Sequence, residues 1–200
     1  MSAAPDSPDS SASPDQLLDA GLGHHRAGDL AGAARCYTLA LERAPDSARG
    51  WHLLGLTHAQ AGEPADAQAL IARALAIDPG FGEAHFDLGD LHQRLGRNPD
   101  AAACYRAAIA ADATAPWCAR AWSNLGIVLR ELGENDAAIA AWCQALASEP
   151  GRIDTRINLA SMLHHTGAID HAIAAYRAVL AAQPRHRAAK RGLEEALRLT

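Results

Sequence analysis

The sequence predicts an all-α fold, a right-handed α-solenoid of five helix-turn-helix hairpins closed by a C-terminal capping helix. Two observations lead to this prediction. Of the 200 residues, 49% are hydrophobic but only 4% are aromatic, and alanine is the commonest apolar residue, which favours closely packed helices. Residue types also recur about every 34 positions, a period typical of stacked helical hairpins.

The repeat is visible when five segments that start at residues 14, 48, 82, 119 and 153 are aligned. The eighth place always holds a small residue: Gly21, Gly55, Gly89, Gly126 and Ala160. The fifteenth place is always glycine: Gly28, Gly62, Gly96, Gly133 and Gly167. The twentieth is always alanine and the twenty-fourth always large: Ala33, Ala67, Ala101, Ala138 and Ala172, then Tyr37, Ile71, Tyr105, Trp142 and Tyr176. Five concordant copies predict one repeated structural unit.

The elements follow in chain order. Residues 1–13 are rich in Pro, Ser and Asp, and we expect them to be disordered. Five units follow, at about 14–47, 48–81, 82–118, 119–152 and 153–186. Each carries two amphipathic stretches that break at the glycine in place fifteen, and a proline ends the second stretch in four of the units. The small residues in places eight and twenty should let the two helices close up, and the large residue in place twenty-four should fill the gap between units.

The last unit and the third unit of the repeat array each depart from the regular pattern. The last unit would leave an apolar face open, so residues 187–200 are expected to form a capping helix with Leu193, Ala196 and Leu197 on its inner face. The third unit has 37 residues instead of 34, and its insertion places Trp117 in a loop. We expect Trp117 either to plug the widened joint or to anchor a partner.

The pattern of Trp or Leu, then Leu-Gly, Gly, Ala, Tyr and Pro over 34 residues resembles the tetratricopeptide repeat. The resemblance covers about residues 14–184. It implies hairpins stacked into a superhelix whose concave groove is lined by the first helix of each unit and commonly holds a peptide or partner segment. It also implies a scaffold for protein–protein interaction without enzymatic activity.

Charge and cysteine spacing exclude several other classes. The formal net charge is −5 and the body of the chain has no dense basic run, which argues against nucleic acid as a partner. The four cysteines form no CxxC pair, so a structural zinc site is not expected. The first residues lack the features of a secretory signal, and no apolar run is long enough to span a membrane. We therefore expect a cytoplasmic protein.

No catalytic or cofactor-binding constellation is found in the sequence. His24, His58 and His92 share place eleven of three successive units, but they should lie on different helices, too far apart for one metal ion. We expect them to pack at the hairpins. No HExxH, GxSxG, P-loop or strand-led GxGxxG occurs, so the prediction is that there are no catalytic residues, no cofactor and no metal.

The groove is the remaining candidate site. The second place alternates in charge along the stack and predicts a ladder of inter-unit ion pairs: Asp15, Arg49, Glu83, Arg120 and Asp154. Asn124 and Asn158, in the sixth place, resemble the asparagine ladder with which O-GlcNAc transferase-type superhelices hold an extended peptide. Glu83, Asp87 and Asp90 form an acidic stripe that is either solvated or selective for a basic segment. The candidate partner-binding residues are Arg49, His52, Glu83, Asp87, Asp90, Arg120, Ser123, Asn124, Ile127, Arg130, Asp154, Asn158 and Ser161, with Trp117 as a loop anchor.

Three functions stay open at this stage. The first is a protein-interaction scaffold that binds a partner peptide in the groove. The second is an accessory module for a glycosyltransferase or sulfotransferase. The third is a scaffold that assembles with itself through its end units. A clamp for a chaperone's C-terminal carboxylate is not expected, because the required Lys and Asn places hold Leu18, Leu22 and Leu53.

Overall fold

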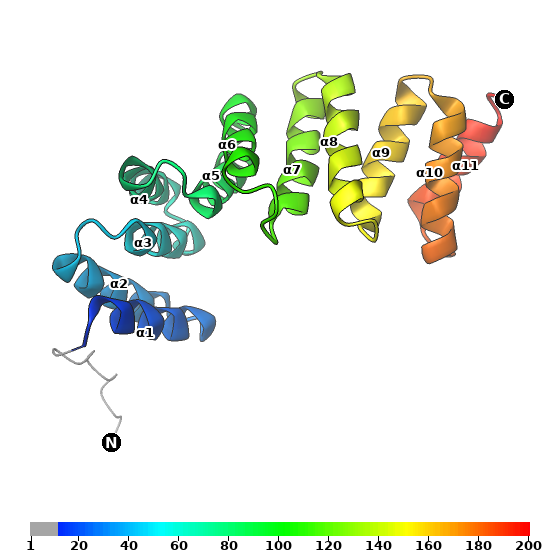
Figure 1. The fold of residues 1–200 in the computed structure, drawn as a ribbon. Coiled ribbons are helices and arrows are strands. Elements are labelled where there is room, and N and C mark those ends of the chain that lie inside the picture. The colour runs from blue at the N-terminus through cyan, green and yellow to red at the C-terminus, as the bar shows by residue number, and fades with distance from the viewer. Residues whose placement is uncertain (1–11) are drawn as a thin grey trace. The chain divides into compact units, whose positions relative to one another are not determined.

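The computed structural model describes residues 12–200, so nearly all of the tail predicted to be disordered lies outside the described residues. Within that range every regular element is a helix (Figure 1). The helices are α1 (Pro14–Arg26), α2 (Leu30–Arg43), α3 (Ala48–Ala61), α4 (Pro64–Ile77), α5 (Gly82–Arg94), α6 (Asn98–Ala111), α7 (Cys118–Glu131), α8 (Asn135–Ser148), α9 (Ile153–His165), α10 (Ile169–Ala182) and α11 (Arg187–Leu197). The prediction of an all-α fold is confirmed.

The glycine in place fifteen makes the tight turn of each hairpin. Gly62, with φ of 83°, ends α3 in the left-handed conformation, which glycine adopts without a steric penalty. Its four counterparts also have positive φ, and no other described residue does. One residue type in one place therefore ends the first helix of each pair and lets the second begin within a few residues.

The packing inside a hairpin depends on places eight and twenty-four together. The indole of Trp142 is fully buried against Gly126, where an added Cβ would lie 2.4 Å from Nε1. The same indole donates a hydrogen bond of 3.1 Å to the carbonyl oxygen of Ser123. Gly21 lies against Tyr37 in the same way. The large residue therefore covers the glycine of its own hairpin. It also reaches the following helix, as predicted, since Tyr105 accepts a hydrogen bond from Asn124 of α7 and Tyr176 lies against Gly192 of α11.

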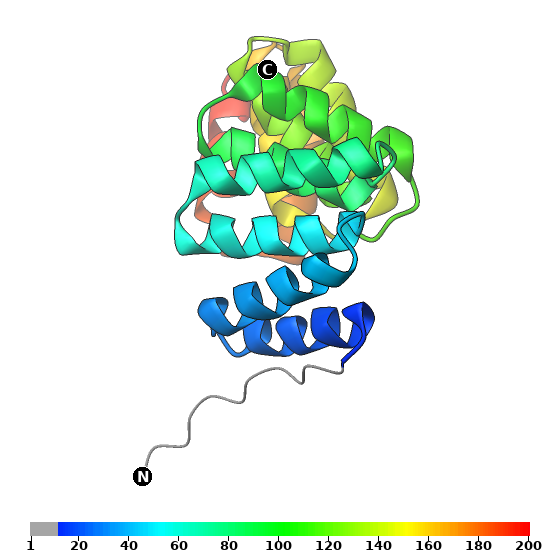
Figure 2. The same ribbon diagram turned by 90° about the vertical axis from the view of Figure 1, so that its left-hand side faces the viewer.

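The chain divides into two compact units, residues 1–91 and 92–200, and the division falls inside α5. In the N-terminal unit α1 packs on α2, α2 on α3 and α3 on α4, and Figure 2 shows these helices in successive layers. Leu17, Tyr37 and Leu54 belong to its hydrophobic core. In the C-terminal unit each helix from α6 to α11 packs on the next.

The capping helix α11 packs on both α9 and α10. Ala189, Gly192 and Ala196 form its buried face, and Gly192 lets α11 approach the ring of Tyr176, since an added Cβ would lie 2.4 Å from that ring. The prediction for Leu197 is wrong, because its side chain is 46% exposed. The inner face is thus formed mainly by small residues, which allow a closer approach than leucine would.

The insertion lies between α6 and α7. Trp117 is half-buried and occupies the N-cap position of α7 without a side-chain capping bond. In the part of the chain that the structure describes, none of the helices combines the length and the apolarity that crossing a bilayer requires.

Candidate partner-binding site

A pocket of about 510 Å³ opens on the N-terminal unit. Its walls come from α1, α3, the turn between α4 and α5, and the first turn of α5. The lining residues are Leu22, Ala48, Arg49, His52, Leu53, Asp78, Phe81 and Glu83. Three of them, Arg49, His52 and Glu83, were predicted from their places in the repeat. Leu22 and Phe81, which also line the pocket, were not among the predicted residues. The alignment gives the place of a residue in its own hairpin but not which neighbouring elements converge on it.

His52 holds the wall of this pocket together. Its side chain is only 2% exposed, and its Nε2 lies 2.8 Å from Oδ2 of Asp87, which joins α3 to α5. The edge of the His52 ring meets Phe81, with ring centroids 4.9 Å apart. A buried imidazole with a hydrogen-bonded partner fixes the position of neighbouring side chains. His52 and Asp87 therefore shape the pocket, and neither is an open contact residue.

The rim of the same pocket carries more negative than positive charge. Arg49 is its one guanidinium, and Nη2 of Arg49 lies 3.8 Å from Oδ1 of Asp19. The carboxylates of Asp78 and Glu83 also belong to the lining, and Asp78 accepts a hydrogen bond from the Gly80 amide. The ion pair of Arg49 thus runs to the sixth place of the preceding repeat, whereas the ladder predicted partners in the second place. A shallow apolar floor with a surplus of carboxylates suits a segment that is both apolar and basic.

A second pocket, of about 290 Å³, lies on the C-terminal unit between α7 and α9 and reaches the start of α8. Its lining residues are Arg130, Asn135, Asn158, Ser161, Met162 and His165. Arg130, Asn158 and Ser161 were predicted from the sequence. Among the described residues no hydrogen bond engages the side-chain amide of Asn158. The Ser161 hydroxyl is hydrogen-bonded to Tyr176. The other polar groups of the lining belong to Arg130, Asn135, Asn158 and His165.

Several predicted groove residues do not line either pocket. Ser123 is buried and its hydroxyl lies 2.8 Å from that of Thr155, which joins α7 to α9. The amide of Asn124 donates to the Tyr105 hydroxyl at 3.5 Å, so the two asparagines differ in their availability. The remaining candidates outside the pockets are half-buried or exposed: Asp90, Trp117, Arg120, Ile127 and Asp154.

The histidines of place eleven lie at the hairpin turns. His24 Nδ1 lies 2.9 Å from Asp29, and His58 Nδ1 lies 2.6 Å from Glu63, five residues along in each case. The third hairpin has Arg97 in that place instead of an acid. There the Nδ1 atom of His92 is buried without a hydrogen bond, and burial lowers the pKa of this imidazole.

One group of side chains has the donor types of a metal site. The ligand atoms of His58, Glu63 and Asp66 lie within 4.8 Å of one another at the turn between α3 and α4. The two carboxylates are exposed, and the His58–Glu63 hydrogen bond repeats the pairing of His24 with Asp29. Because that pairing already accounts for the position of two of the three groups, the cluster is part of the turn.

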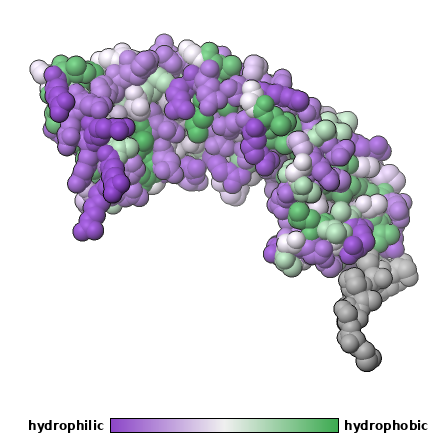
Figure 3. Space-filling model, turned by 180° about the vertical axis from the view of Figure 1, so that it is seen from behind, coloured by the Kyte–Doolittle hydropathy of each residue, from purple (hydrophilic) through white to green (hydrophobic). Residues whose placement is uncertain are grey.

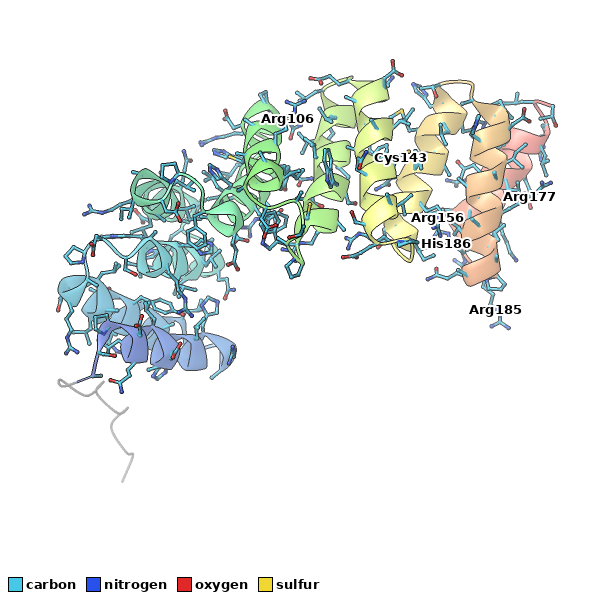
Figure 4. The ribbon with its side chains drawn as sticks, viewed as in Figure 1. Arg106, Cys143, Arg156, Arg177, Arg185 and His186 are labelled. Carbon is cyan, nitrogen blue, oxygen red and sulfur yellow. The ribbon has the colours of Figure 1, made fainter. Side chains whose placement is uncertain are left out.

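Three of the four cysteines are poor candidates for a nucleophile. Cys36 and Cys118 are buried, and burial raises the pKa of both thiols. Burial also raises the pKa of Cys104 to about 11. Cys143 is exposed on α8 (Figure 4). A thiol with a raised pKa carries little thiolate at neutral pH, and the thiolate is the reactive form.

The surface outside the pockets is largely hydrophilic on the face shown in Figure 3, where hydrophobic side chains occur as separate patches. The two pockets are the candidates for a binding site. The pocket of the N-terminal unit combines apolar walls with a few polar groups, whereas polar side chains form most of the lining of the other pocket.

Comparison with models of known protein families identifies one family. The tetratricopeptide repeat family matches residues 18–80 and 86–153 in one form and residues 153–186 in another. No curated protein sequence matches the chain closely enough to be counted as a relative.

Several solved structures are similar in fold to this chain. A crystal structure of MamA protein is 26% identical, with a TM-score of 0.73 over 84% of this chain and 90% of that one. PilF of Pseudomonas aeruginosa is 20% identical, with a TM-score of 0.76 over 93% and 91%. YrrB, described as a tetratricopeptide repeat protein with an unusual peptide-binding site, is 18% identical, with a TM-score of 0.75 over 90% and 91%. Because PilF and YrrB are at most 20% identical to this chain, the comparison with them shows a shared fold. The matches to the family models span most of the sequence.

The helical hairpins, the glycines in place fifteen and the family matches agree with one another. The chain therefore belongs to the tetratricopeptide repeat family, whose members generally serve protein–protein interaction.

Proposed function

We propose that this chain is a non-enzymatic interaction scaffold that binds extended segments of partner proteins in the pockets of its two units. The observation that carries the proposal is that both pockets lie on the first helices of hairpins, where the repeat pattern places partner-binding residues. The peptide-binding site of YrrB, a protein of the same fold, supports this use of the hairpins.

Asn158 is the residue on which recognition of the backbone depends in this proposal. An amide side chain offers a donor and an acceptor together, which matches the alternating groups of an extended peptide. Arg130 lies in the same pocket and adds a cationic group for a carbonyl or carboxylate. Asn124 contributes less, because its amide already bonds Tyr105.

The test is a peptide array followed by fluorescence anisotropy with the peptides that bind. We expect Asn158→Ala to weaken binding about tenfold, since one side-chain amide makes two hydrogen bonds of about 0.5–1.5 kcal/mol each. Asn124→Ala should weaken it less. Gln144→Ala is the matched control, because it removes an exposed amide from α8, outside both pockets.

Equal affinities of the parent protein and the Asn158→Ala and Arg130→Ala variants would contradict the proposal for this pocket. Failure of every peptide in the array to bind the parent protein above background would contradict the proposed function as a whole.

A further inference from the structure

Charge is distributed unevenly along the sequence. Residues 1–91 contain 5 basic and 13 acidic side chains, whereas residues 92–200 contain 13 basic and 10 acidic ones. The acidic surplus in the first unit includes Asp78 and Glu83 at its pocket. Surfaces of opposite sign on one kind of chain favour association between copies, since each copy carries both halves of the match.

The pocket of the N-terminal unit calls for an occupant with two chemical properties. Leu22, Leu53 and Phe81 give it apolar walls, so it suits a large apolar side chain. Asp78 and Glu83 carry negative charge at its rim, while the charge of Arg49 is partly compensated by Asp19. A fitting segment therefore places an arginine or lysine next to a leucine or a similar residue.

The C-terminal unit carries such a segment. Leu197, Arg198 and Leu199 lie at and just beyond the end of α11, and among the described large hydrophobic side chains Leu199 and Leu197 are the most exposed, at 64% and 46%. Arg198 is also exposed.

The cations around this segment are largely unpaired. Of the basic side chains of α11 and Arg198, only Arg191 forms an ion pair within residues 12–200, with Glu195. Apolar side chains flanked by unpaired cations complement a pocket that has apolar walls and an acidic rim.

We propose that the pocket of the N-terminal unit in one copy binds the segment 197–199 of a second copy. Leu199 lies against Leu22, Leu53 and Phe81, and Arg198 meets Glu83 and Asp78. The two contact surfaces differ, so the association is heterologous and leaves a pocket and a segment free for further copies. The inference rests on the proposed function only in treating this pocket as a binding site for a protein segment.

Sedimentation velocity of the full chain over a range of concentrations tests the proposal. We expect the weight-average sedimentation coefficient of the parent protein to rise with concentration, and to rise less in about 0.5 M NaCl, because salt screens exposed charges. Leu199→Ser, Arg198→Glu and Glu83→Arg should each weaken association, by about fivefold or more for the charge reversals.

Mixing the charge-reversal variants gives the sharpest result. Each variant alone brings like charges together, but a mixture of Arg198→Glu with Glu83→Arg contains two matched pairs, parent segment with parent pocket and reversed segment with reversed pocket. We therefore expect the mixture to associate where neither variant alone does. Arg177→Glu, which changes an exposed cation on α10 (Figure 4), and Glu42→Arg, which changes an exposed anion on α2, are controls that should associate like the parent.

The proposal would be overturned by a parent protein that is monomeric at all concentrations, by association that survives each charge reversal, or by equal weakening in the controls. A sedimentation coefficient that changes with salt or with the substitutions, but not with protein concentration, would indicate a contact within one chain. That result would also overturn the proposal. Glu83→Gln replaces Glu83→Arg if circular dichroism shows that the arginine variant is unfolded.

Leu199→Ser and Arg198→Glu change residues outside both pockets, so these two variants should keep the Asn158-dependent peptide binding of the C-terminal unit. If peptide binding is retained and the parent protein does not associate, this inference fails while the proposed function stands. If association occurs and no peptide binds, the proposed function fails by itself.

Discussion

Gly126 shows how one residue sets the distance between two helices. Glycine inside a helix costs roughly 1 kcal/mol relative to alanine, yet α7 keeps it next to the fully buried indole of Trp142. The indole bonds the carbonyl of Ser123, one turn before, so the ring cannot move away without losing this hydrogen bond. The stability lost in the helix is offset by the complete burial of the Trp142 indole.

Replacing Gly126 with alanine should therefore destabilise the protein despite the better helix propensity of alanine. We expect a loss of about 1–3 kcal/mol in the free energy of unfolding, the usual range for overpacking a core, measured by urea denaturation. Gly23→Ala is the matched control, since Gly23 is exposed in α1 and an added Cβ there has no neighbour within 4 Å. The control should gain stability. A Gly126→Ala variant at least as stable as the parent would contradict this account.

At the scale of the elements, polar pairs between helices decide which groups stay open to a partner. His52 and Asp87 join α3 to α5, and Ser123 and Thr155 join α7 to α9. Buried polar groups that satisfy each other stabilise one arrangement of the helices, and a lone one is costly. Tyr105 and Gln93 form such a pair between α6 and α5. At the turn between these helices, however, the Nδ1 atom of His92 is buried without a hydrogen bond.

The turn after α5 should make stability depend on pH. Burial lowers the pKa of His92 below its ordinary value of 6.5, although Asp100 opposes this shift. The unfolded chain then binds more protons than the folded one as the pH falls through 6.5, so folding stability decreases below that pH. We expect His92→Gln to reduce the stability lost between about pH 7.5 and about pH 5.5, measured by urea denaturation at each pH.

A second variant of this turn separates charge from packing. Arg97→Glu restores the acidic residue found at Asp29 and Glu63, and should raise the pKa of His92, measured by NMR titration of the ring protons. An unchanged His92 pKa in this variant, or an unchanged pH dependence in His92→Gln, would contradict the interpretation.

At the scale of the whole molecule, each hairpin depends on a neighbour to cover its apolar face. The last hairpin relies on α11, which packs on α9 and α10 and forms a cluster with Tyr176 and Val179 through Ala189. The outward side of α11 is charged, so the array ends in a surface that water can solvate.

Removal of residues 187–200 should expose Tyr176 and Val179 and lower stability. We expect a loss of about 2–4 kcal/mol from the apolar area returned to water, and faster hydrogen exchange of amides in α10. A truncation that removes only residues 198–200 is the control, since it keeps the whole of α11. Equal urea midpoints for the long truncation and the parent would show that α11 does not act as a cap.

The sequence by itself determined the family, the helical class and the positions of the turns. Places eight, fifteen and twenty-four carry this information because their physical demands are local: a close approach, a positive φ and a large side chain one helix away. Any hairpin of this length meets them in the same way, so they recur in each copy and can be aligned. Part of the candidate site could also be predicted, because Arg49, Glu83, Arg130 and Asn158 keep groove places.

The tertiary structure decided which groove places are open. His52 and Ser123 were predicted to face the groove but are buried by partners 35 and 32 residues away. It also left Leu197 exposed where the pattern placed it inside, because the small residues of α11 already fill the contact with α10. The repeat fixes the direction of a side chain within its hairpin, whereas its exposure depends on the distance to the next hairpin, which no single repeat encodes.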